Sequence, residues 1–265
     1  MQRNIITKTV LPDVKKIIMV TSGKGGVGKS TIAAGLSINL VRKGFKVGLL
    51  DADIFGPSIP TLFNIGDDER PMLSERDGKQ RIEPLERNAL KIMSIGFFFD
   101  QDQAVVWRGP MVTNAIKQLM TETDWGELDY LIIDTPPGTG DVLITLLQSF
   151  AISGVLVVTT PQLMALADVQ KAISMLSDQK IGAPILGIVE NMSWFTPLSH
   201  SDEKYYLFGK GGAKKLSEQF DLPVLAQIPV NETICGDCDS GDLIKLFDDE
   251  MLRLSFDQLT KCLVG

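Results

Sequence analysis

Residues 23 to 30 form a glycine-rich run that ends in a lysine and a hydroxyl, Gly-Lys-Gly-Gly-Val-Gly-Lys-Ser. Glycines let the backbone N–H groups of such a turn converge on phosphate oxygens without obstruction from side chains. Lys29 can reach the terminal phosphates, and Ser30 offers a hydroxyl to Mg²⁺ at the start of a helix whose dipole favours the phosphate charge. The run therefore predicts a site for a nucleoside triphosphate and Mg²⁺. The expected nucleotide contacts are Gly23, Lys24, Gly25, Gly26, Val27, Gly28, Lys29, Ser30 and Thr31.

The segments on either side of this run distinguish a binding loop from an ordinary glycine-rich turn. An apolar stretch at residues 17–20 precedes it, and Ile32, Leu36 and Leu40 follow at helical spacing. A strand, a glycine-rich turn and an amphipathic helix in that order are the context in which such a motif binds phosphate. The alternative of a turn without a ligand is much less favoured.

Carboxylates follow two further segments that read as buried strands. Asp51 and Asp53 come after residues 45–50, and Asp134 comes after residues 130–133. Ligands of parallel sheets lie outside the carboxyl ends of the strands, so these carboxylates can meet Mg²⁺ and the attacking water. Aspartates after strands can also simply cap turns or helices, and that alternative stays open, more so for Asp51 than for Asp134.

The chain resembles a known group of proteins. Lys24 makes the loop similar to the deviant Walker A motif of the MinD, ParA and nitrogenase-iron-protein class. Within that class, residues 51–58 (DADIFGPS), 134–141 (DTPPGTGD) and 189–193 (VENMS) resemble the Mrp (ApbC-like) iron-sulfur cluster carriers. The resemblance covers nearly the whole chain.

This resemblance implies specific roles, with ATP as the nucleotide. Lys24 would reach across a homodimer to the partner's nucleotide, Asp53 would position water, and Asp134 would hold hydrated Mg²⁺ together with Ser30 and Asp53. Asn191 would read adenine, and Pro229 is a further expected nucleotide contact. A lysine supplied in trans acts as an arginine finger does, by adding positive charge in the transition state. The implied activity is slow, dimer-dependent ATP hydrolysis, with apo iron-sulfur proteins as clients.

The cysteines depart from the family pattern. The family's Cys-x-x-Cys usually follows Val-Glu-Asn-Met-Ser-x-Phe, but residues 194–200 contain no cysteine. A different pair, Cys235 and Cys238, follows the last predicted strand, and two copies across a twofold axis would supply the four thiolates of a [4Fe-4S] cluster. Neighbouring aspartates disfavour thiolates. A bridging cluster and a pair of plain loop thiols therefore both remain open.

Composition limits the other possibilities. The chain has 265 residues, 44% of them hydrophobic, and a net charge of −7. This charge argues against broad binding to nucleic acid or anionic lipid. No apolar run reaches the roughly 20 residues of a membrane span, and the N-terminus lacks a signal-peptide pattern. With three cysteines in a chain of this length, we expect reduced thiols and a cytoplasmic protein.

The alternation of strand-like and helical segments predicts an α/β fold, with a doubly wound, mostly parallel sheet between two helical layers. One P-loop NTPase domain is expected to span residues 1–265. Strands are expected near residues 17–22, 45–50, 90–95, 130–134, 154–160, 185–190 and 224–228, and helices near 29–42, 110–122, 141–150 and 162–179. The polar residues 66–87 predict a loop or a hairpin excursion.

A second function fits the same class of loop. A MinD- or ParA-like ATPase switch would position or partition other molecules through DNA or membrane, without a cluster. The amphipathic residues 250–264 carry only two basic side chains, Arg253 and Lys261, which makes a poor anchor for an anionic membrane. The carrier interpretation is therefore the stronger one.

Overall fold

The computed structural model describes residues 8–76, 78–98, 109–179, 181–197, 200, 203–231 and 234–264. Strands form close to every predicted position. They are β1 (Val14–Ser22), β2 (Val47–Asp51), β6 (Leu90–Ser94), β7 (Leu128–Asp134), β8 (Gly154–Thr159), β9 (Ile185–Glu190) and β10 (Val224–Gln227). The long helices are α1 (Lys29–Arg42), α3 (Gly109–Glu122), α4 (Asp141–Ser149), α5 (Leu163–Leu176), α6 (Gly212–Phe220) and α8 (Glu250–Val264), and the short ones are α2 (Ile59–Leu62), α7 (Ile234–Asp239) and the 3-10 helices η1 (Ile95–Phe98) and η2 (Leu243–Phe247).

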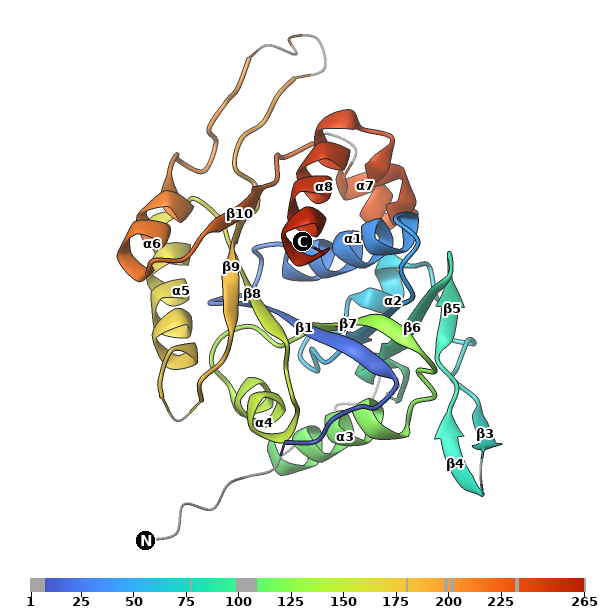
Figure 1. The fold of residues 1–265 in the computed structure, drawn as a ribbon. Coiled ribbons are helices and arrows are strands. Elements are labelled where there is room, and N and C mark those ends of the chain that lie inside the picture. The colour runs from blue at the N-terminus through green and yellow to red at the C-terminus, as the bar shows by residue number, and fades with distance from the viewer. Residues whose placement is uncertain are drawn as a thin grey trace, which may run out of the picture.

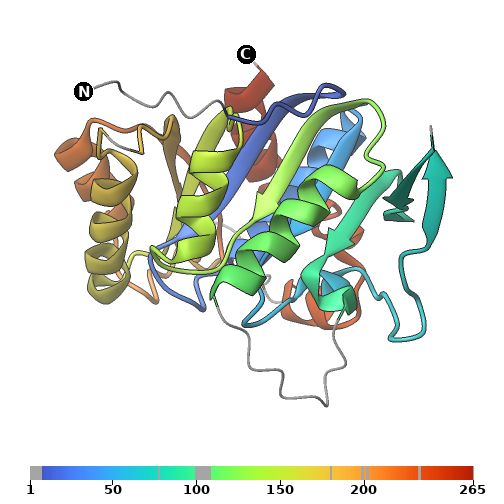
Figure 2. The same cartoon turned by 90° about the horizontal axis from the view of Figure 1, so that it is seen from below.

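These strands join one eight-stranded sheet with the order β10-β9-β8-β1-β7-β2-β6-β5, where β5 spans Leu85–Arg87 (Figure 1). All neighbours are parallel except β5 and β6. Helices α3, α4 and α5 lie on one face, and α1 and α8 lie on the other (Figure 2). The predicted doubly wound α/β fold is confirmed.

Burial explains why the central strands are so uniformly apolar. Strands β2 and β8 are buried along their whole length, and β1 is buried from Ile17 onward. A parallel sheet covered on both faces needs apolar side chains on both faces, so its strands read as continuous hydrophobic runs rather than alternating ones. Their carboxyl ends then carry the first polar side chains, and these lie at one edge of the sheet.

The polar stretch at residues 66–87 is more structured than a loop. It contains an antiparallel hairpin of β3 (Leu73–Arg76) and β4 (Lys79–Ile82), which agrees with the hairpin alternative. It also contains the edge strand β5, which the sequence pattern did not predict. The mixed charge of β5 suits a short edge strand, because charged side chains discourage further pairing.

No helix in the ranges that the structure describes is both long and apolar enough to cross a bilayer.

Candidate functional site

The predicted phosphate loop connects the end of β1 to the start of α1. Gly26 and Gly28 have φ values of 77° and 78°, a region that favours glycine. A cavity of about 300 Å³ opens beside the loop. Eight of the predicted residues line it: Lys24, Gly25, Gly26, Gly28, Lys29, Ser30, Thr31 and Asp53. The strand, turn and helix expected from the sequence therefore form one concave site.

Gly23 and Gly28 are needed for close packing. A Cβ atom at Gly23 would lie 2.4 Å from the backbone of Asp168 and Val169 in α5, and one at Gly28 would lie 2.2 Å from the side-chain nitrogen of Asn191. Neither position has space for a side chain. Gly25 differs, because a Cβ there would meet no atom within 4 Å and would point into open space.

Lys29 joins the loop to the two predicted carboxylates. Its Nζ lies 2.5 Å from Asp134 Oδ1 and 3.5 Å from Asp53 Oδ2, and all three side chains are largely buried. Parallel pairing aligns Asp51 at the end of β2 with Asp134 at the end of β7, which brings the Asp53 segment beside Asp134. The sequence prediction that these groups meet at the carboxyl ends of strands agrees with this geometry.

The second oxygen of Asp134 fits a metal ligand. Oδ2 is buried and has no hydrogen-bond partner among the described residues, and the Ser30 hydroxyl lies near the same carboxylate. Burial raises the pKa of Asp134, while the adjacent Lys29 ammonium opposes that rise. A carboxylate oxygen and a hydroxyl are hard ligands of the kind that Mg²⁺ takes alongside phosphate and water. Ser30 and Asp134 therefore fit a magnesium ion at the phosphates.

Asp51 has a different position from Asp53. Its carboxylate accepts hydrogen bonds from the backbone N–H groups of Asp53 and Ile59, at 3.0 and 3.1 Å, and from the Ser94 hydroxyl at 3.1 Å. Burial raises the pKa of Asp51 to about 8, and the charge of Asp134 adds to the rise. Asp51 thus holds the turn between β2 and α2, as the capping alternative expected. Ser94, which the sequence did not single out, completes that network.

Asn191 reaches the phosphate loop from the end of β9. Its side-chain Nδ2 donates a hydrogen bond to the Val27 carbonyl at 2.9 Å, so this residue touches the loop although it is 164 positions away. Pro229 is buried just beyond β10 and does not line the cavity. The structure therefore brings Asn191 into contact with the phosphate loop, and neither Asn191 nor Pro229 lines the cavity.

Lys24 differs from Lys29 in its surroundings. Its side chain is half-buried at the cavity, and its ammonium forms no ion pair with the residues that the structure describes. A cation held at a cavity rim without a carboxylate partner is available to a ligand or to another chain.

The cysteine pair lies in α7, not in a loop. Cys235 and Cys238 are three residues apart in this helix, so the expectation of two loop thiols was wrong in its local structure. Cys238 is half-buried and packs against the hydrophobic core, and α7 packs against α2. In the described ranges, no group of three or more histidine, cysteine, aspartate or glutamate side chains could hold a metal within one chain.

Glu190 is a buried residue to which the sequence motif at residues 189–193 assigned no role. It is 1% exposed at the end of β9, next to Asn191, and its carboxylate accepts three hydrogen bonds. Burying a carboxylate without hydrogen-bond partners costs free energy, so a glutamate at the end of an apolar strand indicates that specific partners lie around it.

Comparison with known proteins gives consistent relatives. The family model described as "ParA: NUBPL iron-transfer P-loop NTPase" matches residues 13–263. An iron-sulfur cluster carrier protein of Aquifex aeolicus is 47% identical over 92% of this chain, and one of Escherichia coli is 46% identical over 86%. The iron-sulfur cluster transfer protein NUBPL of Dictyostelium discoideum is 42% identical over 89%. The chain spans 65%, 60% and 71% of these relatives, respectively.

Solved structures separate a nearer group from a more distant one. A nucleotide-binding protein from Archaeoglobus fulgidus in complex with ADP has a TM-score of 0.77 and 36% identity, and the match covers 93% of both chains. The cell division ATPase MinD of Pyrococcus furiosus has a TM-score of 0.65 and 22% identity over 94% of this chain and 98% of its own. The latter likeness concerns the fold alone.

Proposed function

The chain belongs to the ParA-type family of NUBPL iron-transfer P-loop NTPases, and on this premise we propose that it is an ATP-hydrolysing carrier of iron-sulfur clusters. The observation that carries the proposal is the buried group of Lys29, Asp53 and Asp134 beside a complete phosphate loop. ATP, Mg²⁺ and water are the reactants that this arrangement suits. The cluster is the cargo, and apo iron-sulfur proteins are the clients.

The residues at the cavity divide the work of hydrolysis. The backbone N–H groups of residues 25–30 hold the phosphates, and Lys29 neutralises charge on the terminal group. Asp53 accepts a hydrogen bond from the attacking water and orients it toward that phosphate. Ser30 and Asp134 would hold Mg²⁺, which when bound neutralises charge on the phosphate oxygens.

A homodimer is part of this proposal. Three large apolar side chains are widely exposed on segments that follow sheet strands: Phe55 after β2, at 86%, and Leu163 and Met164 after β8, at 74% and 77%. Exposed apolar side chains of this size favour burial against another chain. Lys24, whose ammonium has no ion-pair partner among the described residues, would then reach the nucleotide bound to the second copy.

The cysteine pair supports a site shared by two subunits. Two thiols in one helix can supply half of a [4Fe-4S] ligand set, and a twofold axis supplies the other half. Helix α7 packs against α2, and Leu62 of α2 lines the nucleotide cavity. Cys235 and Cys238 thus lie one helix away from the nucleotide, which suits cluster release under control of ATP.

A MinD- or ParA-like positioning switch is the weaker candidate. The three relatives named above, each more than 40% identical, are called cluster carriers or a cluster transfer protein, whereas the MinD likeness extends to the fold only. Helix α8 also lacks the basic face that an amphipathic helix needs in order to bind a membrane of anionic lipid.

The proposal is tested by cluster transfer. Protein reconstituted anaerobically with iron and sulfide should restore the activity of an apo [4Fe-4S] acceptor enzyme, and Mg-ATP should change the rate. Iron and sulfide without the protein, at equal concentration, serve as the control. Restoration that is equally fast in the control contradicts a carrier function. An ATP-independent transfer contradicts the proposed nucleotide control.

A further inference from the structure

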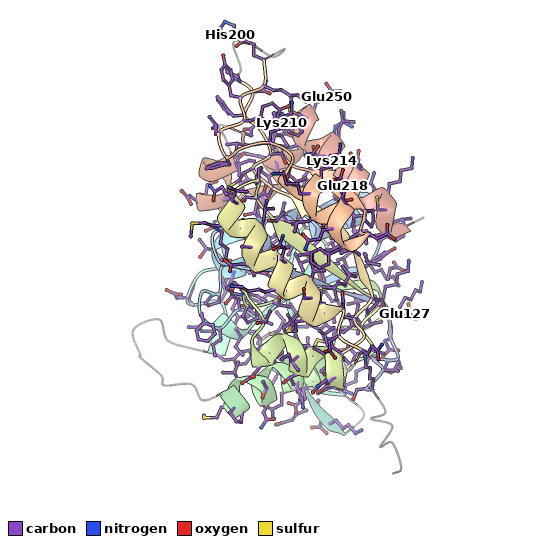
Figure 3. All side chains as sticks on the ribbon, turned by 90° about the vertical axis from the view of Figure 1, so that its left-hand side faces the viewer. Glu127, His200, Lys210, Lys214, Glu218 and Glu250 are labelled. Atoms are coloured by element: carbon purple, nitrogen blue, oxygen red, sulfur yellow. The ribbon has the colours of Figure 1, made fainter. Side chains whose placement is uncertain are left out.

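After β9 the chain projects away from the sheet and then returns to α6 (Figure 1). We call the outgoing part the first leg and the returning part the second leg. We call the described residues 191–197 and 203–211 the arm. Figure 3 shows His200 at its far end and Lys210 nearer the body. The arm starts at Asn191, which contacts the phosphate loop, and ends at Gly211, the residue before α6. It also contains the segment where the family usually has its Cys-x-x-Cys.

The arm is an ordered ribbon near its base. Phe195 and Tyr205 exchange two backbone hydrogen bonds, each 2.8 Å long, across the two legs. The Lys204 ammonium lies 4.1 Å from the centre of the Trp194 ring, which is within the range of a cation–π interaction. The Val230 N–H donates to the Trp194 carbonyl at 2.7 Å, so the first leg is also joined to the segment after β10.

The Glu190 carboxylate accepts hydrogen bonds at the base of this ribbon. Its Oε1 accepts hydrogen bonds from the Ser193 hydroxyl at 3.1 Å and from Gln227 Nε2 at 2.7 Å. Its Oε2 accepts the Ala213 N–H of α6 at 2.6 Å. One buried carboxylate therefore binds the start of the first leg, the first turn of α6, which follows the second leg, and strand β10. The N-terminus of α6 favours the negative charge at this place.

The same residue fixes Asn191. The backbone carbonyl of Glu190 accepts the Ile228 N–H at 2.8 Å, and the Asn191 N–H donates to the Thr159 carbonyl at 2.8 Å. These bonds leave the Asn191 side chain aimed at the Val27 carbonyl of the phosphate loop. Met192, the next residue, has a φ of 55°, which is uncommon for a side chain of its kind and turns the chain into the arm.

We propose that Glu190 is a positioning residue that couples the nucleotide loop to the arm. Its carboxylate joins the first leg to α6 and β10, and Asn191 is the next residue in the chain. A shift of the Asn191 amide toward a bound base therefore changes the bonds at the base of the arm. This inference rests on the proposed function, namely that the loop binds ADP and ATP and that the Asn191 amide contacts the base. It adds a chain of contacts through which nucleotide binding can change the arm.

The variants differ in what they leave unpaired. Glu190→Ala removes the acceptor of three donors, of which the Ser193 hydroxyl and the Ala213 N–H are buried. Glu190→Gln can keep the network, because its amide oxygen accepts the Ala213 N–H, its NH₂ donates to the Ser193 hydroxyl, and the Gln227 amide turns over. Glu218→Ala is the matched control, since Glu218 lies on the exposed face of α6, 3.8 Å from Lys214 (Figure 3).

The experiment follows tryptophan emission on titration with Mg-ADP, with calorimetry on the same samples. The parent should bind ADP and change its emission, and Trp194→Phe should lose that change while still binding ADP. Glu190→Ala should bind ADP about tenfold more weakly, because one oriented polar contact is lost, and should show no emission change at saturation. Glu190→Gln and Glu218→Ala should behave as the parent.

The outcomes separate this inference from the function on which it rests. A parent that does not bind ADP in the calorimeter contradicts the proposed function. A parent that binds ADP without a Trp194 signal, or a folded Glu190→Ala protein that keeps the signal, overturns the coupling. If Glu190→Ala does not fold, Ser193→Ala provides the test, because it removes one donor from one leg only. It should reduce the signal, and an unchanged signal overturns the coupling.

Discussion

The phosphate loop and helix α7 lie close together, separated by α2, but they are built on different principles. The loop binds through backbone N–H groups that a continuous run of residues supplies between β1 and α1. Helix α7 offers two thiols in a short helix, and one chain cannot complete a cluster with them. The loop residues are contiguous, and the chain itself adds Asp53, Asp134 and Asn191 to them. The cluster site proposed at α7 would need a second copy of the chain.

The largest expected effect is a loss of ATP affinity when the loop lysine is removed. Lys29→Ala should lower ATP affinity at least about 100-fold, because charged contacts to phosphate are lost in a buried site. Asp53→Ala should keep the affinity and lose turnover, since Asp53 orients water and does not hold phosphate. Calorimetry with a non-hydrolysable ATP analogue and a phosphate-release assay measure the two quantities. Equal losses of affinity in both variants would contradict the division of roles.

A second prediction tests whether the loop also needs a partner. Lys24→Ala and Asp53→Ala proteins should each be inactive, and an equal mixture should recover about a quarter of the parental ATPase rate after subunit exchange. Half of the dimers are then mixed, and each mixed dimer has one intact site. An absence of recovery, with mixed dimers demonstrated by differently tagged subunits, excludes the role of Lys24 in trans.

The third and smallest effect separates packing from ligand binding within the loop. Gly23→Ala places a Cβ 2.4 Å from the α5 backbone and should destabilise the fold by about 1–3 kcal/mol. Gly25→Ala meets no atom within 4 Å and should leave the melting temperature of the free protein nearly unchanged while weakening ATP binding. Thermal unfolding with and without Mg-ATP measures both. If the Gly25→Ala protein melted at a lower temperature than the Gly23→Ala protein, the packing described for the loop would be wrong.

Local signals in the sequence predicted most of the residues that lie together at the cavity beside the loop. The loop motif is contiguous, and Asp53 and Asp134 follow apolar strands whose parallel pairing aligns their ends. The capping role of Asp51 was one of two open alternatives, because a carboxylate after a strand has the same sequence signature in both. What decides between them is the position of the Ile59 N–H, which depends on the turn into α2.

Some contacts distant in sequence were not predicted, among them those of the Glu190 side chain. The partners of Glu190 come from α6 and β10, 23 and 37 residues further along the chain, and nothing in their types marks them as partners. Strand β5 escaped prediction because it is short, charged and at an edge, where burial imposes no apolar pattern. The helical structure at Cys235 and Cys238 was missed because glycine and aspartates in that stretch favour a turn.

The central claim is that Cys235 and Cys238 of two subunits hold the transported cluster. Parent, Cys235→Ser/Cys238→Ser and Cys262→Ser proteins are reconstituted side by side with iron and sulfide, and iron is measured per dimer together with absorbance. Cys262 is an exposed thiol of α8 and serves as the matched control. The account predicts about four iron atoms per dimer in the parent and the control, and none in the double variant, which should still bind ATP. Equal iron in all three proteins, or none in the parent, would contradict it.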